Sequence, residues 1–226
     1  RKLTESMNRN LSNGLNAVKK IAKNLNLGDD KIFGTLGELI QFNEKYKTCV
    51  EVIGGNALFH VVVDNENTAT ILMNELHKDK LGRVTFMPLN KLDLSEQISY
   101  PSMEENCIPL IKKLHFDPKF STAVKLIFGR TIVVKELTTG VRLAKQHKLT
   151  SITPDGDRVD QKGVLSGGFN DFNQKTTRLD SLKILKQKRN EFAVTERHLA
   201  ELKAILEQND TEIDKINSKI KEVTSE

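Results

Sequence analysis

The stretch YKTCVEVIGGN at residues 46–56 returns 74 positions later as FSTAVKLIFGR at residues 120–130. An aromatic residue, a small residue, Val, Ile and Gly coincide between the two copies without a gap. After each copy a strand pattern follows, and a helical pattern comes after the strand. This internal duplication predicts two related subdomains in the middle of the chain.

The region around the duplication mixes helical patterns with short strand patterns. The runs FHVVV (residues 59–63) and TIVVK (residues 131–135) are rich in β-branched residues, and Gly and Pro separate them from the helical stretches. This alternation favours a mixed α/β (α+β) globular domain. We place the domain at residues 29–175, with subdomains at about 29–100 and 101–175.

The last segment, residues 176–226, has the pattern of a long coiled-coil helix. No Pro or Gly occurs from residue 182 onward, and apolar residues recur every seven positions with a second apolar column three residues later. The first column is Phe192, Leu199, Leu206, Ile213 and Ile220, and the second contains Leu202, Ile216 and Val223.

The first segment, residues 1–28, has a weaker helical stripe in which Gly14 is a flaw. The stripe consists of Leu11, Leu15, Val18, Ala22 and Leu25. If the globular domain brings its two ends together, the terminal helices can bury their stripes against each other as an antiparallel coiled coil. Because the sequence starts at Arg1 without Met and ends within a charged helical pattern, we expect a piece of a longer polypeptide.

The excess of positive charge lies in the N-terminal segment. The chain has a formal net charge of +5, and residues 1–28 hold six basic residues against one acidic residue, whereas the rest of the chain is balanced. Cations at the inner ends of both terminal helices would meet where the helices leave the domain, and we call this set the basic neck. The basic neck consists of Lys19, Lys20, Lys23, Lys183, Lys186, Lys188 and Arg189. It could neutralise DNA phosphates without reading sequence, or it could simply be a solvated helix face.

Several classes of protein are disfavoured by what the sequence lacks. No apolar run approaches the ~18 residues of a membrane span, and no signal-peptide pattern opens the chain. Cys49 and Cys107 have no CxxC or His partner, which favours buried thiols. The five histidines are scattered, and no nucleophile elbow or metal-ligand spacing occurs. We therefore expect a protein outside the membrane, with no catalytic site, no metal and no cofactor.

The glycine-rich run GDRVDQKGVLSGG at residues 156–168 does not have the spacing of a phosphate-binding loop. Six residues separate Gly156 from Gly163, and Phe169 follows the last glycine, where a P-loop requires four residues and then Gly-Lys-Ser/Thr. The preceding TPDG (residues 153–156) predicts a type I turn with a G1 bulge between two antiparallel strands. The glycines then favour either close approach of another chain by strand addition or an irregular exit loop.

Four motifs resemble the hinge domain of the structural maintenance of chromosomes (SMC) family. They are IFGTLGELI (32–40), LGRVTFMPL (81–89), FGRTIVV (128–134), and DGD (155–157) followed by GVLSGG (163–168). They occur in order within the predicted domain, between the predicted coiled coils. Within the family, KLTSITPDGDRVD (148–160) is most similar to the cohesin branch.

The resemblance implies a hinge of two similar subdomains that dimerises through glycine-rich strand edges, with ATP hydrolysis in a distant head domain. The family's glycine motif maps onto Gly156, Gly163, Gly167 and Gly168, although family members often have Gly-Gly where this chain has Lys162-Gly163. The implied dimer interface comprises Gly156, Arg158, Gly163, Val164, Leu165, Gly167 and Gly168.

The implied function is that of a dimerisation hinge that pairs with the hinge of the other cohesin SMC subunit. Such pairing closes a ring that entraps DNA for sister chromatid cohesion in the nucleus, on chromosomes, and the hinge would be a candidate DNA entry gate. Homodimerisation of the isolated fragment and contacts with cohesin accessory subunits are compatible with the same resemblance. The alternative is a DNA-binding module that acts through the basic neck.

Overall fold

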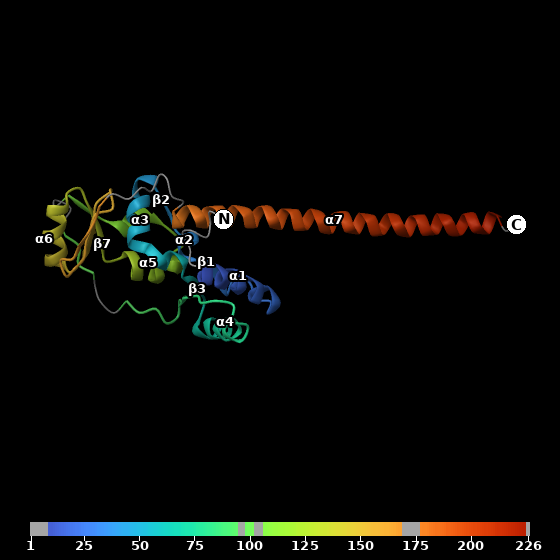
Figure 1. The fold of residues 1–226 in the computed structure, drawn as a ribbon, viewed down its shortest axis with the longest axis horizontal. Coiled ribbons are helices and arrows are strands. Elements are labelled where there is room, and N and C mark those ends of the chain that lie inside the picture. Colours follow the sequence, from blue (N-terminus) through green and yellow to red (C-terminus); the bar gives the residue numbers. More distant parts are fainter. Residues whose placement is uncertain (1–8, 95–97, 102–105, 169–176, 225–226) are drawn as a thin grey trace. The chain divides into compact units, whose positions relative to one another are not determined.

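The computed structural model describes residues 9–94, 98–101, 106–168 and 177–224 (Figure 1). The chain divides into two compact units, Arg1–Leu182 and Lys183–Glu226, and each is described by itself. The predicted mixed α/β class is confirmed for the first unit, whose described residues form three sheets and several helices.

The first half of this unit is built on a three-stranded sheet. Its strands are β1 (Ile32–Thr35), β3 (Val61–Val63) and β4 (Phe86–Pro88). β3 lies in the middle, antiparallel to β1 and parallel to β4. All three residues of β3 are buried, which explains its unbroken β-branched run. The helical elements of this half are α2 (Leu36–Leu39), η2 (Glu44–Tyr46), α3 (Lys47–Gly54), η3 (Gly55–Phe59) and α4 (Glu66–Lys78).

The second half repeats this arrangement and extends it. Its sheet has the order β10-β9-β8-β7-β5. The strands are β5 (Cys107–Pro109), β7 (Thr131–Val134), β8 (Thr150–Ile152), β9 (Arg158–Val159) and β10 (Leu165–Ser166). β7 is antiparallel to β5 and parallel to β8, as β3 is to β1 and β4. The helical elements are η5 (Leu110–Lys113), η6 (Pro118–Phe120), α5 (Ser121–Phe128) and α6 (Leu137–His147).

Equivalent elements of the two halves meet at the centre of the unit. β2 (Gln41–Phe42) of the first half pairs with β6 (Leu114–His115) of the second, and α3 contacts α5 beside them (Figure 1). The duplicated sequences thus fold into η2–α3 and η6–α5, and the two halves are related subdomains. Their exact boundaries stay a prediction, because residues 95–97, 102–105 and 169–176 lie outside the described residues.

The N-terminal helix α1 (Arg9–Asn24) packs within the first unit, against α4. Leu15, Val18 and Ile21 are buried, while Leu25 of the predicted stripe is exposed. The interpretation of Gly14 as a flaw is wrong. A Cβ there would lie 2.7 Å from Cγ2 of Val84, so the glycine lets the segment after α4 approach the helix.

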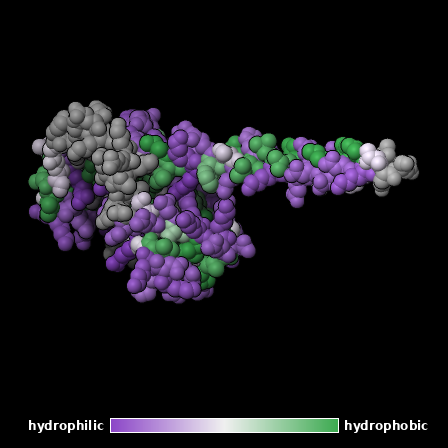
Figure 2. Space-filling model, turned by 45° about the vertical axis from the view of Figure 1, so that its right-hand side comes forward, coloured by the Kyte–Doolittle hydropathy of each residue, from purple (hydrophilic) through white to green (hydrophobic). Residues whose placement is uncertain are grey.

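The C-terminal helix α7 (Arg178–Thr224) is continuous over 47 residues. Its first turn belongs to the first unit, where Leu179 and Leu182 are buried, and the rest forms the second unit. The predicted first column of the heptad pattern is 53–64% exposed, and Figure 2 shows a hydrophobic strip along this helix. Pairing of α7 with an antiparallel helix stays a prediction.

Candidate dimer interface

The turn between β8 and β9 has the predicted geometry. The N–H of Gly156 donates to the carbonyl of Thr153 at 3.0 Å, and the N–H of Thr153 donates to the carbonyl of Asp157 at 2.9 Å. Gly156 has φ +98°, the left-handed conformation that a G1 bulge requires. Asp157 also donates its N–H to Oγ1 of Thr153. The turn therefore fixes where β9 begins.

A second turn joins β9 to β10, and Asp160 holds it in place. Its Oδ1 accepts from the N–H groups of Lys162 and Val164, at 2.8 and 2.9 Å. Gly163 follows with φ +86°, whereas Lys162 has no positive φ. This chain has Lys162-Gly163 where family members often have Gly-Gly. The lysine is compatible with the backbone, because only the second position of the two has a positive φ that favours glycine.

β10 is the terminal strand of its sheet. It pairs with β9 alone among the described residues, so one side of β10 offers unpaired backbone groups. Val164 and Leu165 are 59% and 57% exposed at this edge. Two exposed apolar residues beside an unpaired edge are the features that strand addition uses.

The last two glycines of the run follow this edge. Gly168 has φ +126°, and its N–H donates to Oδ1 of Asp157 at 3.1 Å. A Cβ on Gly167 would collide with the Asp157 carboxylate, whereas a Cβ on Gly163 or Gly168 would meet nothing within 4 Å. Three of the four glycines, Gly156, Gly163 and Gly168, therefore have a backbone conformation that favours glycine, and the sequence predicted this reason for Gly156 alone.

Arg158 lies next to the turn, in β9. It is half-buried and in register with Ser166 of β10 and Ile152 of β8. Its Nε is buried without a hydrogen-bond partner in the part of the chain that the structure describes. All seven predicted interface residues thus lie on one hairpin and the turn before it.

The basic neck is divided between the two units. Lys19, Lys20 and Lys23 are exposed on α1 in the first unit. The remaining members, Lys183, Lys186, Lys188 and Arg189, lie on α7 in the second unit. Lys188 pairs with Glu191 at 2.7 Å in an exposed contact, which neutralises it only weakly. The meeting of the two clusters at one place stays a prediction.

Comparison with known proteins supplies the family. Residues 29–144 match the family model described as SMC proteins Flexible Hinge Domain. This chain belongs to the SMC hinge family. The match includes the predicted duplication and ends before the glycine-rich hairpin.

The individual similarities support the predicted resemblance to the cohesin branch of the family. The hinge is 50% identical to Structural maintenance of chromosomes protein 3 of Saccharomyces cerevisiae over 229 residues, covering 100% of this chain and 18% of that protein. A structure titled "Folded elbow of cohesin" matches with a TM-score of 0.79 and 50% identity, covering 100% of this chain and 32% of that one. The asymmetric dimer of the Geobacillus stearothermophilus SMC hinge domain matches with a TM-score of 0.59 and 25% identity, covering 83% of this chain and 77% of that one. The hinge spans less than a fifth of the length of the curated relative.

The start of α7 is anchored by polar residues that sequence reasoning missed. Thr177 and Asp180 form a reciprocal cap, in which the N–H of Asp180 donates to Oγ1 of Thr177 and Oγ1 of Thr177 donates to Oδ2 of Asp180 at 2.8 Å. The pattern Thr-x-x-Asp before an apolar run could have revealed this cap. Two residues of α3 complete the anchor: Lys47 pairs with Asp180 at 2.7 Å, and the carboxylate of Glu51, only 2% exposed, accepts from the N–H of Leu179 at 2.6 Å.

The charges of this anchor stabilise one another. Burial alone would raise the pKa of Asp180, but hydrogen bonds from Lys47 and Thr177 and the Lys47 charge hold that pKa below its usual value. Burial would likewise lower the pKa of Lys47, but Asp180 holds it above the usual value. A paired lysine and aspartate therefore join α3 to the first turn of α7.

The two cysteines lie in the interior of the described part of the chain. Cys49 and Cys107 are buried and are not joined in a disulfide, and burial raises the pKa of Cys49 to about 11, which keeps it a thiol. Among the described residues, no three His, Cys, Asp or Glu side chains could jointly hold a metal ion. No helix in the described ranges is both long and apolar enough to cross a bilayer.

Proposed function

We propose that this hinge is the dimerisation element of a cohesin SMC subunit and that it pairs with the hinge of the other cohesin SMC subunit. The observation that carries the proposal is the unpaired edge of β10, with Val164 and Leu165 exposed beside it. A strand of the partner would add to this edge through main-chain hydrogen bonds, while the two apolar side chains would fill partner pockets. The dimeric hinge from Geobacillus stearothermophilus supports this reading.

Such pairing would join two SMC arms at one end and help close a ring that entraps DNA for sister chromatid cohesion. The hinge would act on chromosomes in the nucleus as a non-catalytic element, and opening of the β10 contact would make it an entry gate for DNA. The name of the yeast relative and the cohesin structure support this context.

Introducing a negative charge at the β10 edge tests whether this edge forms the dimer interface. We expect Leu165→Glu to weaken pairing with the partner hinge by at least about 30-fold, because a buried interface anchor contributes ~2 kcal/mol or more. Leu165 is exposed in the single chain, so the substitution should leave folding intact. The measurement is the mass distribution of the mixed hinges in sedimentation velocity over a concentration series.

Ile71→Glu on α4 is the matched control for this test, since Ile71 is 44% exposed and lies in the other half. It should pair like the unchanged hinge. If the Leu165→Glu variant paired as strongly as the unchanged hinge, β10 would not be part of the interface.

The alternative function is DNA binding through the basic neck. It is favoured by the exposure of six of the seven cations, all but Arg189. Reversing Lys19, Lys20, Lys186 and Lys188 to Glu should weaken retention of duplex DNA and lower the salt dependence of binding, because each phosphate contact releases counterions. Unchanged retention in a gel shift at low salt would eliminate this alternative, and dimerisation of the variant serves as the folding control.

A further inference from the structure

The first turn of α7 lies on a face of the first half that α2 and α3 form together. Its Leu179 and Leu182 are both 2% exposed there. α2 comes so close that a Cβ on Gly37 would collide with the side chain of Leu182. On α3, Glu51 accepts from the N–H of Leu179, and Lys47 makes the ion pair described above. We call this face the α7 seat, and its members are Gly37, Lys47 and Glu51.

The internal duplication places an equivalent face in the second half. Residues 36–54 correspond without a gap to residues 110–128, 74 positions later. In the structure, η5 therefore takes the place of α2, and α5 takes the place of α3. We call this second face the η5–α5 face: Ile111, Ser121 and Lys125 hold the three positions of the α7 seat, and Lys112 and Leu126 are adjacent in sequence.

The η5–α5 face is open where the corresponding side of α3 is covered. Leu126 is 47% exposed, and Lys125 is exposed beside it. The equivalent of Leu126 is Val52, which is half-buried because the turn between β8 and β9 lies against it: a Cβ on Gly156 would be 3.5 Å from Cγ2 of Val52. The exposure of Leu126 means that no described segment covers α5 in the same way.

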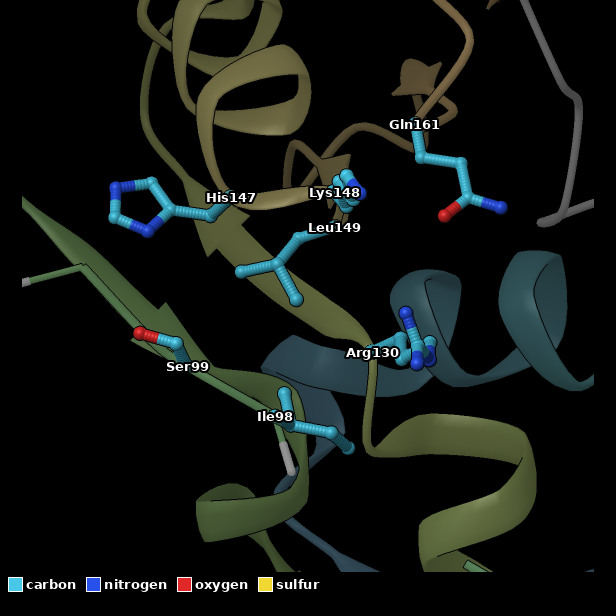
Figure 3. Close-up of a pocket in the computed structure, with 7 residues that line it drawn as sticks. All are labelled: Ile98, Ser99, Arg130, His147, Lys148, Leu149 and Gln161. Carbon is cyan, nitrogen blue, oxygen red and sulfur yellow. The ribbon is translucent and has the colours of Figure 1, made fainter. Parts of the chain in front are cut away.

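The segment between the two halves reaches α5 at its C-terminal end. There the hydroxyl of Tyr100 donates to the carbonyl of Gly129 at 2.6 Å, and a Cβ on Gly129 would lie 3.0 Å from Cδ1 of Ile98. Figure 3 shows Ile98 and Arg130 beside one opening just past this end. The segment therefore packs against the end of the helix, while Leu126 stays exposed.

Lys125 reverses the charge that Glu51 contributes to the α7 seat. Glu51 is negative and binds the amide end of α7, where a helix carries a partial positive charge. Lys125 is positive at the equivalent position, and Lys112 is positive where α2 has Glu38. Neither lysine forms an ion pair with a described residue. The η5–α5 face therefore suits the carbonyl end of a helix and acidic side chains near that end.

We propose that the η5–α5 face binds a short amphipathic helix of a partner protein. An apolar side chain of that helix would cover Leu126, and its acidic C-terminal turn would lie against Lys125 and Lys112. Two observations favour this occupant: the α7 seat holds a helix end, and the reversed charge at Lys125 favours the opposite end. Duplex DNA would engage the lysines but would leave Leu126 exposed. The proposal does not depend on the proposed pairing through β10.

Two synthetic peptides titrated into the 226-residue chain test the proposal. Both are alanine-rich helices of about 15 residues with two leucines three positions apart, as in the first turn of α7. One has two glutamates in its last turn, and the other has two lysines. We expect saturable amide shifts at Lys112, Lys125 and Leu126 in NMR spectra, with at least fivefold tighter binding of the glutamate peptide. Because lysines at the C-terminus favour helix formation, the helix content of the peptides cannot produce this preference.

Three variants of the chain assign the binding to this face. Lys125→Glu should reverse the preference between the peptides, because it restores the charge of Glu51 at the equivalent position. Leu126→Ser should weaken both peptides at least threefold, and since Leu126 is exposed in the single chain, folding should be unaffected. Lys145→Glu is the matched control, because Lys145 is exposed on α6 and lies outside the η5–α5 face. Its affinities should change less than twofold.

Three results of the titration would overturn the proposal. They are the absence of saturable shifts, a preference that Lys125→Glu leaves unchanged, and shifts centred on Ile71 and Met73, which are exposed on α4. A DNA duplex is titrated in parallel. If the duplex shifts Lys112 and Lys125 while neither peptide binds, the face contacts nucleic acid and the proposal is wrong.

Discussion

At the scale of single residues, the duplication is most strongly preserved inside each copy. Val50 and Val124 occupy equivalent positions and are both completely buried. Asn43 and Asp117, which lie just before the duplicated stretches, make the same contact: each side chain accepts from the N–H two residues later. The two copies therefore share a helix start as well as a core position.

The copies diverge where the two halves touch. Gly54 and Phe128 are equivalent in sequence, and a Cβ added to Gly54 would lie 3.2 Å from Cζ of Phe128 and 2.8 Å from the side chain of Leu58. A large residue in one copy thus occupies the space that a glycine leaves in the other. Symmetric residues at both positions would leave either a cavity or a clash, so the asymmetry follows from packing.

At the scale of elements, a charged pair joins α3 to the first turn of α7 within the first unit. Lys47 and Asp180 have exposed side-chain fractions of 23% and 31%, so their pair is partly shielded from water. The two residues are 133 positions apart in the sequence. Loss of this pair would leave the hydrogen bond from the N–H of Leu179 to Glu51 as a polar contact between α3 and the first turn of α7.

We expect Lys47→Met to lower the free energy of unfolding at pH 7 by about 1 kcal/mol, near the upper end for a partly exposed pair. Asp180 has a depressed pKa in the folded state, so its contribution is present above its unfolded pKa near 3.8 and is lost as the pH falls through the folded value. Lys47 has a raised pKa, so the pair persists up to its unfolded pKa near 10.5 and is lost above the folded value.

Urea unfolding over a series of pH values from 7 downward measures the acidic loss, and the stabilities of the two proteins should converge as the pH falls through the folded pKa of Asp180. Lys91→Met is the control, because Lys91 and Glu66 form an exposed pair at 3.4 Å that should contribute little. An equal loss in both variants would mean that the Lys47 pair is an ordinary surface contact.

Local sequence patterns predicted the turns and helices well, but they did not predict which elements pack against one another. The TPDG turn, the glycine at its end and the long C-terminal helix depend on neighbouring residues, and each could be derived from spacing. The partner of α1 could not, because its apolar stripe fits any apolar surface and only the tertiary structure places α4 against it. Lys47 and Glu51 were also missed, since a charge pairing across more than a hundred residues leaves no local signal.

At the scale of the whole chain, the two units differ in how they bury apolar surface. The core of the first unit includes Leu179 and Leu182 at its C-terminal limit, both 2% exposed. The described residues after Leu182 include no buried side chain, although one side of this helix is apolar. The first unit therefore contains its own core, whereas the apolar stripe of the second is exposed, and its burial against another helix stays a prediction.

Truncated fragments test whether the core of the first unit ends at Leu182. A fragment ending at residue 182 should unfold at nearly the same Tm as the full chain, because no core residue is removed. A fragment ending at residue 176 loses two buried leucines, worth about 3–6 kcal/mol together, and its Tm should fall by roughly 10 °C or more. Scanning calorimetry of the three proteins measures both shifts. A large fall in Tm for the 182-residue fragment would contradict the division, and it would mean that residues 183–226 stabilise the hinge core directly.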